Sequence, residues 1–250
     1  MVTQVMDVTE TLTFDHADRK DIYDYIESHG IVREDEVRRA LNFEPAALGA
    51  HLTVLRRDGY IRKVGDKVQV AYEEEDARMF EAEDGTECTI RTAQQVDLDA
   101  LVDAIKEVAE EGTYIEAETV GDMIDHEEVI LRHNKVQSRM VFVATVEDEL
   151  AGWVHLDLPE TGKLRHTAVL TVGARAKFRG KGIGSRLLER GVEWAEEHGF
   201  EKLYNSVPAT NEEAISFLKD HGWETEAVRE DHYKIDDEYV DEVMMAVRLR

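Results

Sequence analysis

Three glycines alternate with other residues between a strand pattern and a helix pattern, within the segment Leu170–Leu188. The loop at the centre of this segment reads Arg179-Gly-Lys-Gly-Ile-Gly184. Glycine lets the backbone approach a ligand closely, and the free N–H groups at a helix N-terminus bind phosphate. The basic side chains of the loop stand out in an acidic chain. The segment therefore predicts a site for a phosphate-bearing ligand.

Two common phosphate motifs do not fit this loop. A dinucleotide fingerprint has the spacing Gly-x-Gly-x-x-Gly, with an acidic residue about 20 positions later at the end of a strand. Here the glycines occupy every second position, and residue 201 begins a strand pattern instead of ending one. A P-loop places Ser or Thr after Gly-Lys, whereas Lys181 is followed by Gly182. Both motifs are excluded.

The elements that must position the loop alternate between strands and helices. Hydrophobic periodicity predicts helices at 98–109, 126–133, 183–199 and 211–222. It predicts strands from Thr89, at 140–146, 150–156, 167–174 and 202–207, around Val228, and at 243–249. Mixed strands and helices around one sheet indicate a fold of the α/β (α+β) class.

The loop resembles the pyrophosphate loop of the GNAT N-acetyltransferase family, Arg/Gln-x-x-Gly-x-Gly/Ala, because Arg179-x-x-Gly182-x-Gly184 matches it in full. The resemblance covers about 89–250. Within it, Asn211–Trp223 is similar to the family's Asn-x-x-Ala-Ile helix, and Asp241–Met245 also looks like the family. The resemblance implies a GNAT-type mixed, mostly antiparallel sheet flanked by helices. It also implies acetyl-CoA as co-substrate and a primary amine as acceptor, in a small molecule or at a protein Lys or N-terminus.

The resemblance also assigns cofactor contacts to residues. Backbone groups of the strand 167–174 would bond the pantetheine arm, where that strand bulges and splays from the next. Loop amides would hold the pyrophosphate, and Asn211 would bond the cofactor while capping its helix. The expected cofactor-binding residues are Val172, Gly173, Ala174, Arg179, Gly180, Lys181, Gly182, Ile183, Gly184, Ser185 and Asn211.

The chain departs from the family at the position of its usual catalytic acid. Many members have Tyr seven residues after the helix-start Asn, and this chain has Leu218, which cannot donate a proton. Losing a general acid costs about 10²-fold or more in rate. The catalytic residues therefore stay unassigned, and no acidic residue can be named as the base. Candidate substitutes for the acid are Tyr204, Tyr233, His155 and His166.

The first part of the chain shows a separate pattern of three helices and two strands. Helical patterns cover 18–29, 33–41 and 45–58, and alternating patterns at 60–64 and 67–72 follow. This order resembles a winged helix-turn-helix domain. An acidic run from Glu73 to Asp76 then opens a stretch with little apolar periodicity. We expect a winged-helix-like domain at 1–75, an acidic linker at 76–87 and an acetyltransferase domain at 88–250.

The role of the N-terminal domain has two interpretations. Basic side chains at the end of its third helix and in its wing could contact DNA phosphates, and these are Arg56, Arg57, Arg62, Lys63 and Lys67. Against DNA, the third helix offers small residues that read base edges poorly. Such folds also mediate protein contacts, including a homodimer. The alternative to an enzyme is therefore a DNA-binding regulator whose second domain senses acetyl-CoA.

Composition limits the remaining possibilities. The net charge of −25 over 250 residues suits a salt-rich cytoplasm, because salt screens self-repulsion. We therefore expect a halophilic, haloarchaeal protein; the alternative is an acidic protein that repels nucleic acid. No apolar run is long enough to span a membrane, and the first ten residues lack signal-peptide features. The single cysteine, Cys88, excludes an internal disulfide framework.

Metal binding is not expected from the spacing of potential ligands. The ten histidines show no ligand pattern, and His126-Glu-Glu128 lacks a second histidine at helical spacing. The sequence therefore predicts an enzyme, or a sensor, without a metal.

Overall fold

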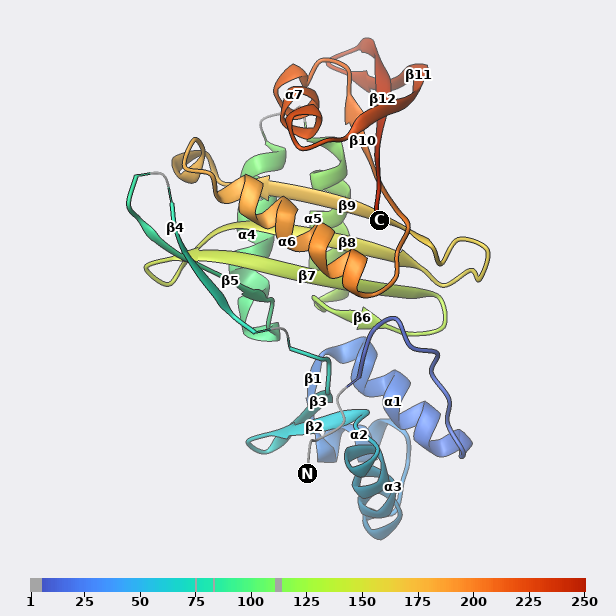
Figure 1. Ribbon diagram of the computed structural model, residues 1–250. Coiled ribbons are helices and arrows are strands. Elements are labelled where there is room, and N and C mark those ends of the chain that lie inside the picture. Colours follow the sequence, from blue (N-terminus) through green and yellow to red (C-terminus); the bar gives the residue numbers. More distant parts are fainter. Residues whose placement is uncertain (1–5, 75, 83, 111–113) are drawn as a thin grey trace.

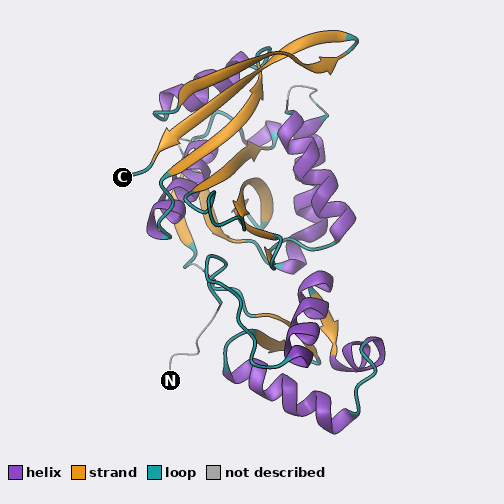
Figure 2. Ribbon diagram, turned by 90° about the vertical axis from the view of Figure 1, so that its right-hand side faces the viewer, coloured by secondary structure: helices purple, strands orange, loops and turns teal. Residues whose placement is uncertain are grey.

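The computed structural model describes residues 6–74, 76–82, 84–110 and 114–250, which form two parts, one above the other in Figure 1. The N-terminal part is the smaller, and the C-terminal part is built around one large sheet (Figure 2). Glu75 and Glu83, which belong to the expected boundary region, lie outside the described residues.

Three helices and a small antiparallel sheet make up the N-terminal part. Its elements are α1 (Ala17–His29), β1 (Ile31–Arg33), α2 (Glu34–Ala40), α3 (Pro45–Arg57), β2 (Ile61–Val64) and β3 (Lys67–Val70). The strands lie in the order β1-β3-β2. Apolar faces of the helices and the sheet form a separate core, which includes Ile22, Tyr23, Ile26, Leu52, Leu55, Ile61 and Val68. The helices and the hairpin follow the expected pattern, while the winged-helix assignment stays a prediction.

A nine-stranded sheet forms the C-terminal part. Its strands are β4 (Arg78–Glu81), β5 (Glu87–Thr92), β6 (Arg132–His133), β7 (Gln137–Val146), β8 (Glu149–Pro159), β9 (Thr167–Ala174), β10 (Lys202–Pro208), β11 (Glu224–Ile235) and β12 (Glu238–Arg248). Their order is β11-β12-β10-β9-β8-β7-β5-β4, and β6 pairs with β7. Only β9 and β10 run parallel within this described sheet. This mixed, mostly antiparallel sheet flanked by helices is the expected fold class.

Helices cover both faces of the large sheet. In Figure 1, α6 (Ile183–Glu197) lies in front of β7, β8 and β9, whereas α4 (Leu98–Ala109) and α5 (Ile115–Glu127) lie behind. The short helix α7 (Glu212–Asp220) follows β10, and two single 3₁₀ turns cover Gln95–Asp97 and Ala176–Phe178. The central strands are buried on both faces, as the unbroken burial of Ser138–Ala144 shows. Within the described residues, no helix combines the length and the apolar character needed to cross a membrane.

Two expected elements differ from the structure. The helix expected at 126–133 is wrong: α5 covers Ile115–Glu127 and ends at Glu128, whose φ of 54° lies in the left-handed region. The residues that follow form a loop and β6. The segment 76–87, expected as a linker, contains β4, which pairs with β5 at the edge of the large sheet. Four residues of mixed polarity are too short to show a strand period.

A buried carboxylate joins the two parts. Glu27 of α1 is 3% exposed and accepts hydrogen bonds from Arg132 Nη1 (3.0 Å), His133 N (3.2 Å) and Asn134 Nδ2 (3.0 Å). Tyr23 donates its hydroxyl to the carbonyl of His133 at 2.8 Å. Because a buried charge is tolerated only when it is paired and hydrogen-bonded, these contacts fix α1 against the segment around β6.

Candidate active site

The parallel strands β9 and β10 separate partway along their length. Their pairing ends at Tyr204 opposite Val169, although β9 continues to Ala174 and β10 to Pro208. At the point of separation, Asn205 Nδ2 donates to the carbonyl of Leu170 at 2.6 Å. The expected splay is therefore present. The expected bulge is not, because β9 pairs with β8 from Val169 to Ala174 without a shift of register.

A cavity of about 360 Å³ opens where these strands separate. Its lining includes all the expected cofactor-binding residues except Lys181, drawn from β9, the glycine loop, the start of α6 and Asn211. It also includes residues that the sequence pattern did not single out, from the start of α5, from β10 and from α7, among them Tyr114, Glu116, Ser206 and Phe217. Residues far apart in the sequence thus share one concave site, the usual form of a small-molecule site.

The glycine loop has the backbone conformation that only glycine adopts readily. Gly180 has φ of 69° and Gly182 has φ of 79°, both in the left-handed region. Gly182 is the N-cap residue of α6 and supplies no side-chain cap. The first N–H groups of α6 therefore keep their hydrogen-bonding capacity for an anion, and the helix dipole adds to the attraction.

The basic side chains of the loop are already engaged. Lys181 Nζ lies 2.8 Å from Asp84 Oδ2, and its hydrogen bond lowers the pKa of that carboxyl. Arg179 donates from Nε to the carbonyl of Ala174 at 2.9 Å and lies over the Tyr114 ring. Arg179 lines the cavity and Lys181 does not. Within the described loop, anion binding therefore falls mainly to backbone N–H groups.

Asn211 and Gly173 line the cavity, and each also has a structural role in the fold. Asn211 is 5% exposed and caps α7, since Ala214 N–H donates to its side-chain oxygen at 3.0 Å. A Cβ on Gly173 would lie 2.4 Å from the Trp153 ring. Only glycine fits there, so the bare backbone of β9 faces the cavity.

A carboxylate that lines the cavity, Glu116, is influenced by a second carboxylate, Glu242. Glu116, in the first turn of α5, lines the cavity and is half-buried. Burial raises the pKa of its carboxyl, and the nearby charge of Glu242 raises it further, against the opposing effect of Arg229. Glu242 is 2% exposed and is bound by Arg229. A carboxylate with a raised pKa in a cavity suits a general base.

Glu116 does not stand out in the sequence, because it lies on a helix that the hydrophobic pattern did not predict. Periodicity placed the helix at 126–133, and α5 begins eleven residues earlier, at Ile115. The signal that could have found it is the spacing of Ala117, Val120 and Ile124, which are all buried in α5.

The expected substitutes for the catalytic acid occupy different places. Leu218 is 2% exposed and lines the cavity. Burial raises the pKa of Tyr204 and of Tyr233, and Tyr233 donates to Glu242 at 3.3 Å. Burial lowers the pKa of His155 to about 3, so this histidine is neutral, and His166 is exposed before β9, at the end of the strand away from the cavity. Both tyrosines are therefore protonated, but the raised pKa makes each a weaker acid, and neither belongs to the described lining of the cavity.

The basic residues of the N-terminal part are largely paired with acids. Arg57 Nε lies 2.6 Å from Asp58, Arg56 Nη2 lies 2.5 Å from Glu34, and Arg62 pairs with Glu74. These pairs reduce the positive charge that the segment would present to a phosphate backbone.

Comparison with known proteins gives a sequence family for most of the C-terminal part. Residues 100–223 match the acetyltransferase (GNAT) family. The Drosophila melanogaster protein named "Probable N-acetyltransferase san" is 30% identical over 93 residues, which are 37% of this chain and 50% of that protein. N-alpha-acetyltransferase 50 of Danio rerio is 28% identical over 93 residues, 37% of this chain and 55% of that protein. The chain thus spans about half the length of the curated relatives that it matches.

A solved structure shares the fold. The structure of yncA from Salmonella typhimurium with its cofactor acetyl-CoA superposes with a TM-score of 0.53 at 18% identity, covering 65% of this chain and 94% of that one. At this identity the likeness concerns the fold alone. Residues 100–223 thus match the acetyltransferase (GNAT) family in sequence, and the solved structure shares the fold of the C-terminal part.

Proposed function

We propose that this protein is an N-acetyltransferase that transfers the acetyl group of acetyl-CoA to a primary amine. The observation that carries the proposal is the cavity at the splay of β9 and β10, whose lining includes both the glycine loop and a half-buried carboxylate. We expect the pantetheine arm of acetyl-CoA to lie along β9 and the acceptor to lie beside Glu116, because both line this cavity.

The residues present fit acetyl-CoA. The uncapped N-terminus of α6 and the left-handed glycines offer N–H groups to a pyrophosphate. The unpaired edge of β9 beyond Val169 offers backbone groups to an amide-bearing arm, as a neighbouring strand would. Bound acetyl-CoA supplies the thioester whose carbonyl carbon the amine attacks.

The reaction requires a base and an acid from this chain. Glu116 accepts the proton that the amine loses as its C–N bond to the acetyl carbon forms. The C–S bond then breaks, and the departing thiolate takes a proton. Leu218 lines the cavity and cannot supply it, so the donor of this proton stays unassigned.

The acidic surroundings favour a cationic acceptor. Glu116, Asp157 and Glu242 all influence the tyrosines of this region, so a protonated amine gains attraction before it gives up its proton. The curated relatives are named as N-acetyltransferases, one of them as an N-alpha-acetyltransferase. We therefore rank peptide N-termini first among acceptors, ahead of lysine side chains and small polyamines.

The test is release of CoA thiol with a panel of amines: peptides with free N-termini, N-blocked lysine peptides and polyamines. The wild type should turn over at least one class. Glu116→Gln should be about 10²-fold slower or more, while Glu118→Gln, exposed on the same helix, should match the wild type. Binding of acetyl-CoA without turnover of any amine would reject the enzyme in favour of an acetyl-CoA sensor.

A further inference from the structure

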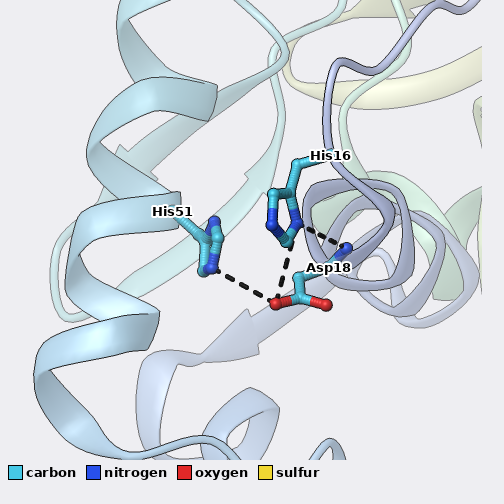
Figure 3. A group of neighbouring side chains, drawn as sticks. All are labelled: His16, Asp18 and His51. Carbon is cyan, nitrogen blue, oxygen red and sulfur yellow. Dashed lines mark hydrogen bonds and ion pairs between the residues drawn. The ribbon is translucent and has the colours of Figure 1, made fainter.

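Two histidines and an aspartate converge in the N-terminal part, and none of them lines the cavity (Figure 3). His16 is the N-cap residue of α1, Asp18 lies in the first turn of that helix, and His51 comes from the middle of α3. Asp18 Oδ2 lies 3.5 Å from His51 Nε2 and 3.7 Å from His16 Nδ1. One ligand atom from each of the three side chains lies within 4.8 Å of the other two.

These separations are close to those of a metal site. Zn²⁺ binds imidazole nitrogen and carboxylate oxygen at about 2.0–2.2 Å in a tetrahedron, so its ligand atoms lie roughly 3.3 Å apart. The two measured gaps to Asp18 exceed that value by a few tenths of an ångström. His16 is half exposed, and rotation of its side chain closes the remaining gap between the two imidazoles.

The cluster is also held in place by its neighbours. The His51 side chain is only 16% exposed, and its ring centroid lies 5.8 Å from that of Phe43 and 5.1 Å from that of His16. A ligand that is already ordered loses little freedom when a metal binds. Imidazole nitrogen is also a typical ligand for Zn²⁺, Ni²⁺ and Cu²⁺, whereas Mg²⁺ and Ca²⁺ prefer oxygen.

We propose that His16, Asp18 and His51 form a binding site for one divalent transition-metal ion, with a water molecule as the fourth ligand. The site is independent of acetyl transfer. Asp18 N–H donates to His16 Nδ1 at 3.1 Å, and coordination through that nitrogen replaces this cap of α1 with a metal bond. The bound ion joins the start of α1 to α3 and stabilises the N-terminal part, because it binds only where these helices are packed.

The test uses the full chain, freed of metal with a chelator and titrated with Co²⁺. Tetrahedral Co²⁺ absorbs strongly in visible light, and Zn²⁺ should displace it. Molar salt suppresses non-specific attraction to the acidic surface, because the Debye length falls to about 3 Å. The wild type should bind a single equivalent with a tetrahedral spectrum.

Matched variants separate this site from a second group of potential ligands, Asp7, Glu73 and His198, which holds one imidazole. The variants His16→Gln and His51→Gln should each bind Zn²⁺ at least about tenfold more weakly than the wild type. Loss of a group that merely supports a ligand already weakens metal binding by about this factor. His16 is the more exposed of the two histidines, so its substitution disturbs the fold less. His198→Gln should bind as the wild type does. Absence of the tetrahedral spectrum in the wild type, or its persistence in both His16→Gln and His51→Gln, would overturn the proposal.

Discussion

The carboxyl of Glu116 lies where the first turn of α5 meets the cavity, with Glu242 nearby. Burial and the second carboxylate both favour its protonated form, so its pKa lies above the usual value for Glu. A base works only when deprotonated. Activity should therefore depend on the ionisation of this one side chain at the acidic end of the pH range.

Glu116→Gln tests that dependence. In the wild type, kcat should fall as the pH drops through the raised pKa of Glu116, at a higher pH than an ordinary glutamate would give. The variant should lose this acidic limb along with most of the activity, because glutamine cannot titrate. A pH–rate profile of both proteins measures this dependence of kcat on pH. An identical acidic limb in the variant would show that another group is the base.

At this scale the sequence singled out the glycine loop, most of which lines the cavity, and did not single out Glu116, which lines it as well. The residues Arg179–Gly184 stand together in the chain, so their spacing alone indicates a phosphate loop. Glu116, Asp157 and Glu242 come from three elements that meet only in the folded sheet. No local pattern marks them.

At the scale of elements, the course of β9 past the cavity depends on packing against β8. Trp153 of β8 pairs with Gly173 of β9, and its ring fills the space where a side chain at position 173 would lie. A Cβ on Gly152 would likewise meet the carbonyl of Gly173 at 2.6 Å. These two glycines let β8 and β9 lie together at the place where β10 departs.

Gly173→Ala should therefore destabilise the protein by about 1–3 kcal/mol, since the added methyl group overlaps the Trp153 ring. Denaturant unfolding measures the loss. Gly49→Ala is the matched control: nothing lies within 4 Å of a Cβ at this position of α3, and alanine should stabilise the helix by up to about 1 kcal/mol. Equal stability of Gly173→Ala and the wild type would mean that β8 and β9 are not packed as described.

Most elements of the C-terminal sheet were predictable, and the exceptions have physical reasons. Strands β7 to β10 are long and apolar, and α4 and α6 are clearly amphipathic, so their periods show in the sequence. The edge strand β4 has four residues of mixed polarity, and β6 has two. Such strands are fixed by pairing with a neighbour, which the sequence does not display.

At the scale of the whole molecule, the two parts are held together by polar contacts in a buried interface. Glu27 receives three hydrogen bonds from the segment 132–134, and Tyr72 donates to the carbonyl of Leu131 at 3.0 Å. Arg132 Nε also lies 3.1 Å from Glu127 Oε2, and the same oxygen lies 2.7 Å from Nη2 of the fully buried Arg139. This chain of charges extends from α1 to β7.

Glu27→Ala should cost about 3 kcal/mol of stability, because it leaves buried donors and part of the Arg132 charge without a partner. Denaturant unfolding that reports on each part separately measures this cost. The control Glu34→Ala removes the half-exposed partner of Arg56 and should change stability by less than about 1 kcal/mol. Similar effects of the two substitutions would show that the interface does not depend on Glu27.

The central claim is that the cavity between β9 and β10 binds acetyl-CoA through the glycine loop. Calorimetric titration of acetyl-CoA into the full chain at high salt tests it most directly, beside Gly182→Glu, which adds a negative side chain at the N-cap of α6. The account predicts stoichiometric binding by the wild type and at least a tenfold loss of affinity in the variant. Folded wild-type protein that does not bind acetyl-CoA, or a variant that binds it equally well, would contradict the account.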